Sequence, residues 1–126
     1  MIQVNYWPKE LRLTVEGHAT DENMQGNPAV CTGASVLVFS LMNTMDGFND
    51  RKWCKSVYFD NGNGYAYMRM FKPRRMKFKA LRVAIGMTFG GLGMLAEKYP
   101  DLIKVKVCNG VYFDDRSCIE KALRET

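Results

Sequence analysis

The polar segment at residues 60–64, Asp-Asn-Gly-Asn-Gly, constrains the fold most strongly because it separates two runs rich in aromatic residues. Asn-Gly between such runs is typical of a β-hairpin, whose tight turn needs residues that tolerate positive φ. The arms of the predicted hairpin cover residues 57–59 and 65–71. The sequence therefore predicts an antiparallel strand pair near the middle of the chain.

Three further strands are predicted from apolar and alternating runs at residues 2–7, 11–16 and 103–107. Pro8-Lys9 separates the first two. In the second, Leu, Leu and Val alternate with Arg, Thr and Glu, which is the period of a half-buried strand. The third presents two lysines, Lys104 and Lys106, on one face. These runs predict additional strands of the same sheet.

Two helices are predicted at residues 28–45 and 78–99. The first has Asn as its N-cap and Pro at its first position, and we expect it to end before Asp46-Gly47. It is apolar nearly all the way round, so we expect it to be buried on most sides or covered by a partner chain. The second ends at Pro100. Its internal glycines, Gly86 and Gly90, predict close packing against the sheet or the first helix.

These elements follow the order β-β-α-β-β-α-β, with a plausible short helix at residues 114–125. Segregated hairpins and two longer helices favour an α+β fold, in which a mainly antiparallel sheet carries two packed helices. We see no linker, repeat or low-complexity segment, so residues 1–126 are expected to form a single domain. A chain of this length can bury about two thirds of its unfolded surface without metals or disulfides.

Composition excludes several classes of protein. The apolar runs, such as residues 36–42, are shorter than a membrane span, and the N-terminus has no signal-peptide pattern, so a cytoplasmic protein without membrane contact is expected. The cysteines form no CxxC pair, which argues against zinc and against a disulfide framework. We therefore expect no metal. Three of the four cysteines are read as small buried or half-buried hydrophobic residues, namely Cys54, Cys108 and Cys118.

The net charge of +5 favours an anionic partner or a ribonucleoprotein environment. The densest basic cluster consists of Lys72, Arg74, Arg75, Lys77, Lys79 and Arg82. It is either a solvated loop and helix start or a surface for RNA, and no base-recognition motif accompanies it.

The only histidine, His18, ends a predicted strand, and Cys31 lies in the first turn of the first predicted helix. A thiol protease needs an imidazole to accept a proton and a thiol to become the nucleophile. A helix N-terminus and a nearby imidazole generally lower a cysteine pKa, and the free N–H groups of the helix could face a developing oxyanion. From spacing alone, a structural histidine and a small core cysteine remain the alternative reading.

The segment Val15-Glu16-Gly17-His18-Ala19, then Gly26, then Ala29-Val30-Cys31-Thr32-Gly33-Ala34-Ser35, resembles the Prp family of ribosomal-processing cysteine proteases. Members carry a Gly-His-Ala strand end, a loop with a glycine and a helix opening of the form Val-Cys-x-x-x-Ser. The element order and the run at residues 98–107 also look like that family.

The resemblance implies a homodimeric cysteine endopeptidase that removes the N-terminal extension of a large-subunit ribosomal protein. It implies His18 as the general base and Cys31 as the nucleophile, without a cofactor. A loop at residues 19–27 would close over a hydrophobic, aromatic-containing substrate segment. The expected substrate-binding residues are Gly17, Ala19, Gly26 and Ser35, although packing is favoured for Ser35.

One departure from the family pattern is Pro28, which stands where an acidic residue is usual, three positions before the cysteine. The role of that carboxylate would be vacant or would pass to Asp21, Glu22 or Glu16. Three alternatives stay open: a member that processes phage structural proteins, a degenerate dimeric scaffold, and a non-enzymatic ribosome- or RNA-associated module. The last would use residues 72–82 with Lys104 and Lys106.

Overall fold

A computed structural model describes residues 1–20 and 26–109 of the chain. Its elements are β1 (Ile2–Trp7), β2 (Arg12–Glu16), α1 (Pro28–Asp50), β3 (Lys55–Asp60), β4 (Tyr65–Phe71), the 3₁₀ turn η1 (Arg75–Lys77), α2 (Phe78–Lys98) and β5 (Ile103–Val107). This order confirms the predicted β-β-α-β-β-α-β arrangement. The helix predicted at residues 114–125 lies outside the described residues.

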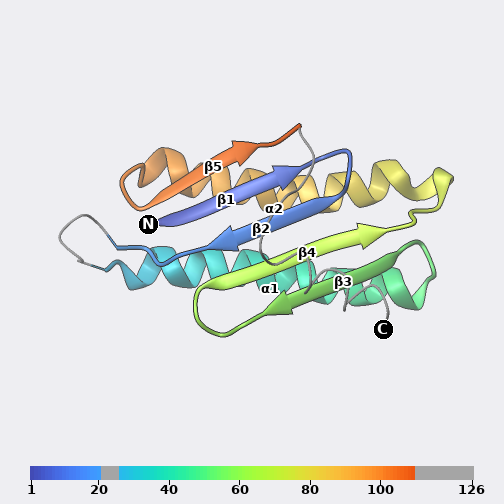
Figure 1. Cartoon of the computed structure of the whole chain (residues 1–126), viewed down its shortest axis with the longest axis horizontal. Coiled ribbons are helices and arrows are strands. Elements are labelled where there is room, and N and C mark those ends of the chain that lie inside the picture. The colour runs from blue at the N-terminus through green and yellow to red at the C-terminus, as the bar shows by residue number, and fades with distance from the viewer. Residues whose placement is uncertain (21–25, 110–126) are drawn as a thin grey trace.

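The strands form one sheet in the order β3-β4-β2-β1-β5, and both helices lie against the same face of it (Figure 1). All neighbours are antiparallel except β1 and β5, which are parallel. The fold is therefore α+β with a mainly antiparallel sheet, as predicted. The core lies between the sheet and the helices, and its fully buried side chains include Leu13, Met45, Met68, Leu81 and Ile85.

β2 is buried on both faces, which the alternating pattern did not predict. Thr14 and Arg12, on the face away from the helices, are each 3% exposed. The same face carries a second cluster of buried side chains, comprising Val57, Tyr65, Tyr67 and Phe71. Because β2 lies in the middle of the sheet, it is flanked by strands on both sides. Its polar residues are therefore buried together with the side chains of those strands.

α1 differs from its prediction in length and in burial. It continues to Asp50 because Phe48 is buried and stacks on Trp53, with ring centroids 5.5 Å apart, so the last turn is held by packing. The prediction of an end before Gly47 was wrong. Val36 and Phe39 are 58% and 53% exposed, so within one chain the helix is not buried on most sides.

The helix–helix contact involves a different glycine from those expected. A Cβ added at Gly86 or Gly90 would meet nothing within 4 Å, whereas one added at Gly91 would lie 2.9 Å from Leu37 of α1. Close packing therefore occurs at Gly91. By length and composition α1 and residues 75–98 would suffice to cross a membrane, but each packs a face into this core, as core helices of soluble proteins also do.

Candidate active site

His18 follows β2 directly, and two glycines determine its position. Gly17 adopts a φ of 98° and donates its N–H to the carbonyl of Gly64, at 2.7 Å. Gly64 belongs to the β3–β4 turn and has a φ of 86°. A Cβ added there would lie 2.8 Å from Nε2 of His18, so the imidazole rests on the bare backbone of this turn.

Cys31 lies in the first turn of α1, as predicted. The side chain of Asn27 caps the helix by accepting hydrogen bonds from the N–H groups of Ala29 and Val30, at 3.1 and 3.3 Å. The N–H of Cys31 donates to the carbonyl of Asn27 at 3.2 Å. These three N–H groups are therefore occupied, and the expectation that they face an oxyanion was wrong.

A different backbone donor reaches the sulfur. The N–H of Ala19 lies 3.4 Å from Sγ of Cys31, and the carbonyl of Ala19 accepts a hydrogen bond from the N–H of Asn27 at 2.8 Å. An isolated antiparallel bridge between Thr20 and Gly26 closes the segment that joins β2 to α1. This pairing brings the end of the strand and the start of the helix together, although Ala19 and Cys31 are twelve positions apart along the chain.

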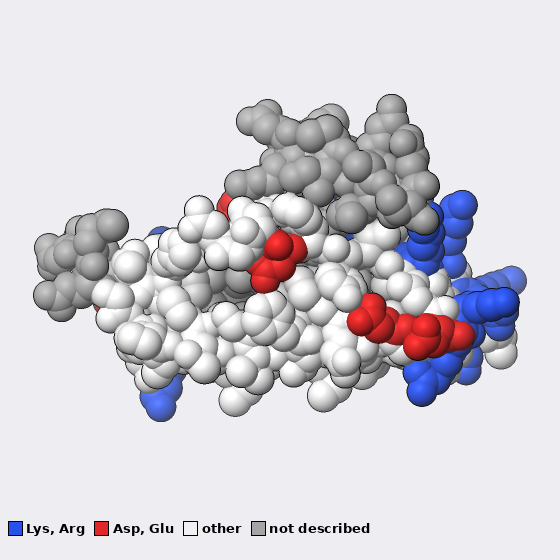
Figure 2. Space-filling view, turned by 90° about the horizontal axis from the view of Figure 1, so that it is seen from below, with Lys and Arg blue, Asp and Glu red and all other residues white. Residues whose placement is uncertain are grey.

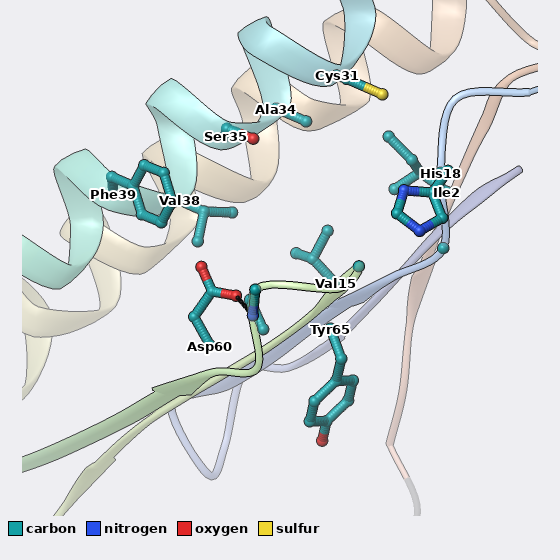
Figure 3. A pocket seen from close by; sticks show the side chains of 14 residues that line it. Ile2, Val15, His18, Cys31, Ala34, Ser35, Val38, Phe39, Asp60 and Tyr65 are labelled. Carbon is teal, nitrogen blue, oxygen red and sulfur yellow. Dashed lines mark hydrogen bonds between the residues drawn. The ribbon is translucent and has the colours of Figure 1, made fainter. Parts of the chain in front are cut away.

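A cleft separates α1 from the sheet at this end of the molecule, and His18 and Cys31 stand on its two sides (Figure 3). The imidazole is exposed and the thiol half-buried. Among the described residues no hydrogen bond joins the two side chains directly. The cleft is otherwise lined mainly by apolar side chains, which are Ile2, Val15, Ala34, Val38 and Phe39, with Ala66 from β4. Tyr65 also borders the cleft, but its side chain points away from α1 (Figure 3).

One carboxylate lines the described part of the cleft, and it belongs to Asp60 at the end of β3. Its Oδ1 accepts the N–H of Gly62 at 2.8 Å, which fixes the side chain at the turn. Glu16 does not line the cleft, while Asp21 and Glu22 lie outside the described residues. Pro28 is the first residue of α1, an ordinary position for proline.

Of the four residues expected to bind substrate, two line the cleft and two do not. Gly17 and Ser35 line the cleft. Ala19 is fully buried and reaches the site through its N–H, and Gly26 pairs with Thr20 away from the cleft lining. Their roles stay predictions.

Sequence reasoning missed Gly64, Asp60 and Phe39 as members of the site. The first two were assigned only to the hairpin, and the third only to an apolar helix. Gly64 contacts His18 because β4 pairs with β2, a fact of sheet order that carries no local signal.

The other described cysteines differ from Cys31 in their surroundings. Cys54 is buried, as expected of a small hydrophobic residue, and burial raises the pKa of its thiol while a hydrogen bond with Ser56 opposes this rise. Cys108 is half-buried, and Cys118 lies outside the described residues. Within residues 1–20 and 26–109 no group of His, Cys, Asp and Glu is arranged to hold a metal ion.

Comparison with known families agrees with this geometry. The family model for the cysteine protease Prp matches residues 1–104, which include both faces of the cleft. The chain belongs to the cysteine protease Prp family. The predicted resemblance is thereby confirmed. No curated protein matches the sequence.

Solved structures show the same fold. The ribosomal processing protease Prp from S. aureus, with a covalently linked product peptide, has a TM-score of 0.65 and 19% identity, covering 86% of this chain and 100% of the other. SMU.848 from Streptococcus mutans has a TM-score of 0.61 and 21% identity, covering 87% and 96%. The S. aureus protease with a substrate peptide has a TM-score of 0.60 and 15% identity, covering 85% and 97%.

Proposed function

We propose that this Prp-family protein is a cysteine endopeptidase that removes the N-terminal extension of a large-subunit ribosomal protein. The supporting observation is that His18 and Cys31 stand on the two sides of one cleft. The solved relative from S. aureus, a ribosomal processing protease, supports the choice of substrate. No cofactor is required, because thiol and imidazole together supply the nucleophile and the proton carrier.

In the proposed reaction the imidazole of His18 accepts the thiol proton, and Sγ of Cys31 attacks the carbonyl carbon of the scissile peptide bond. The carbonyl oxygen gains negative charge, and we assign the N–H of Ala19, which lies 3.4 Å from Sγ, as a backbone donor to it. The imidazolium then protonates the leaving amine as the C–N bond breaks. Water, deprotonated by the imidazole, hydrolyses the resulting thioester and restores the thiol.

Approach of the two catalytic groups requires movement of His18. Its side chain is exposed and lies against the backbone of Gly64. Rotation of the ring over this bare backbone disturbs little packing, so substrate filling the cleft can turn it toward Sγ. A Cβ at position 64 would displace the ring and obstruct that rotation. Catalytic hydrogen bonds of this kind often tighten only in the complex with substrate.

The lining of the cleft supports a substrate segment with hydrophobic side chains. Phe39 and Val38 of α1 face Val15 and Ile2 across it, which suits an apolar or aromatic residue. Asp60 adds one negative charge at the turn end. We infer that a basic residue near the hydrophobic segment strengthens binding modestly, because Asp60 is exposed and surface charge pairs contribute little.

Incubation with a purified ribosomal-protein precursor, followed by mass spectrometry of the products, tests the proposal. We expect one new N-terminus with the wild type, and none with Cys31→Ala or His18→Ala. Cys54→Ala serves as the matched control, since it removes a thiol outside the cleft and should leave cleavage intact. Cleavage by Cys31→Ala would contradict the proposal, as would a stable wild-type protein that leaves the precursor uncut.

We further propose a cytoplasmic homodimer. The outer surface of α2 exposes Val83, Met87 and Met94, and a groove beside them runs between α2 and α1. A second copy would remove this apolar surface from water. Met87→Glu should shift the mass measured by light scattering from dimer to monomer. The matched control is Met76→Glu, at another exposed methionine, away from that groove, and equal masses for both variants would contradict the assigned surface.

A further inference from the structure

Figure 2 shows Lys and Arg side chains gathered at one end of the molecule, with Asp and Glu side chains beside them. The segments that line the cleft, at the end of β2 and the start of α1, lie at the other end (Figure 1). β2 runs between the two ends of the molecule. It begins with Arg12 at the basic end and ends with Glu16, next to Gly17 and His18. The antiparallel partner β4 runs back, from the turn that supports His18 to Phe71. A ligand that occupies only the basic end therefore does not cover the cleft.

Two segments far apart in the sequence meet to form this basic end. The N–H of Arg74 donates to the carbonyl of Trp53 at 2.8 Å, which joins the segment before α2 to the loop after α1. Lys77 and Arg51 lie over the Trp53 ring, 4.4 and 5.7 Å from its centre. The basic end consists of Arg51 and Lys52 after α1, then Lys72, Arg74, Arg75, Lys77, Lys79 and Arg82, with Lys9 in the β1–β2 turn.

The charges of this end are not neutralised within the described chain. All of its residues are exposed except the half-buried Lys77, and over residues 1–20 and 26–109 none of them forms a salt bridge. Lys52 and Lys72 adopt φ values of 59° and 47°, the left-handed region that favours glycine. Lysines in these turns carry charge at a conformational cost that glycine would avoid.

The shape of the basic end favours a polyanion over a lipid surface. A membrane-docking surface combines basic residues with several apolar side chains that insert together. Within residues 51–54 and 71–82, Met76 is the one strongly exposed large apolar residue, while Trp53 is half-buried beneath two cations. The cations instead project from separate turns, as suits contacts with successive phosphates of one strand.

We propose that the basic end binds RNA through its phosphate backbone, independently of base sequence. The uncapped start of α2, whose N-cap Lys77 offers no side-chain acceptor, adds a partial positive charge to the same surface. Lys104 and Lys106 belong to the edge strand β5 and are not part of this surface. If the proposed function is correct, RNA binding at one end would hold the protease beside a ribosomal substrate while the other end cuts it.

Fluorescence anisotropy with a labelled single-stranded RNA of about 16 nucleotides tests the proposal over a series of salt concentrations. The inactive Cys31→Ala protein is used throughout, so the outcome does not depend on protease activity. Arg74→Glu with Arg75→Glu should weaken binding by about tenfold or more. The same pair should reduce the slope of log K against log salt by roughly 1.4, because each phosphate that an arginine neutralises contributes about 0.7.

The matched control is Lys98→Glu with Lys104→Glu, which changes the net charge equally at exposed positions outside the basic end. Its affinity and salt slope should stay close to those of the parent protein. Equal weakening by both pairs would overturn the proposal, since it would indicate attraction by net charge alone. Absence of RNA binding would overturn it too, including the case in which the protein binds anionic phosphatidylserine vesicles instead.

Discussion

Substitution of Gly64 by alanine tests whether the β3–β4 turn positions the imidazole of His18, the proposed general base. A Cβ at this position would lie 2.8 Å from Nε2 and 2.9 Å from Cε1 of His18. Ordinary contacts between such atoms are about 3.5–4.0 Å, so the ring must move by roughly 1 Å. Misplacement on that scale can reduce a rate by about 100-fold.

The same turn offers a matched control in Gly62. Its φ is 70°, close to the 86° of Gly64, but a Cβ added there would meet nothing within 4 Å. Alanine in the left-handed region costs about 1–2 kcal/mol at either position. Because His18 is exposed, moving its ring adds little to that cost. A Cβ at Gly64 would also lie 3.1 Å from the carbonyl oxygen of Gly17, so Gly64→Ala should lose more unfolding free energy than Gly62→Ala. The difference in reactivity is therefore compared under conditions in which both variants are folded.

Two assays separate these effects. Urea unfolding measures the free energy, and site-resolved mass spectrometry measures the rate at which iodoacetamide alkylates Cys31 near neutral pH. We expect Gly64→Ala to approach the slow rate of His18→Ala, with Gly62→Ala close to wild type, and peptide cleavage should follow the same ranking. Equal alkylation rates in the two glycine variants, with both proteins folded, would refute the proposed support of His18 by the turn.

Three further predictions concern the stability of the fold. Asn27→Ala removes the acceptor for two helix N–H groups and should lower the unfolding free energy by about 1 kcal/mol in urea, whereas Asn27→Ser should retain most of it. Gly90→Ala, in open space, should raise that free energy by about 1 kcal/mol through helix propensity; Gly91→Ala should not, because its Cβ presses on Leu37. Burial keeps Cys54 protonated in the folded state to a higher pH than in the unfolded state, so stability falls as pH rises above the ordinary thiol pKa. The decrease in unfolding free energy that comes from Cys54 should be absent in Cys54→Ala.

The sequence by itself determined those features that depend on neighbours in the chain. α1 begins at Pro28 because the side chain of Asn27 caps the backbone N–H groups of residues only two and three positions further along the chain. The hairpin forms where Asn-Gly pairs allow positive φ at Gly62 and Gly64. The same locality made His18 and Cys31 recognisable, since a short family pattern contains both.

Only the tertiary structure decided what depends on contacts between distant segments. α1 extends to Asp50 because the ring of Phe48 stacks on the ring of Trp53. The placement of β4 beside β2 brings Gly64 under His18, and strand order carries no signature in either segment alone. The junction of Trp53 with Arg74 likewise gathers basic residues from two loops onto one end of the molecule, opposite the cleft. Local preferences act within a few residues, whereas packing selects among the many ways in which the resulting elements can be assembled.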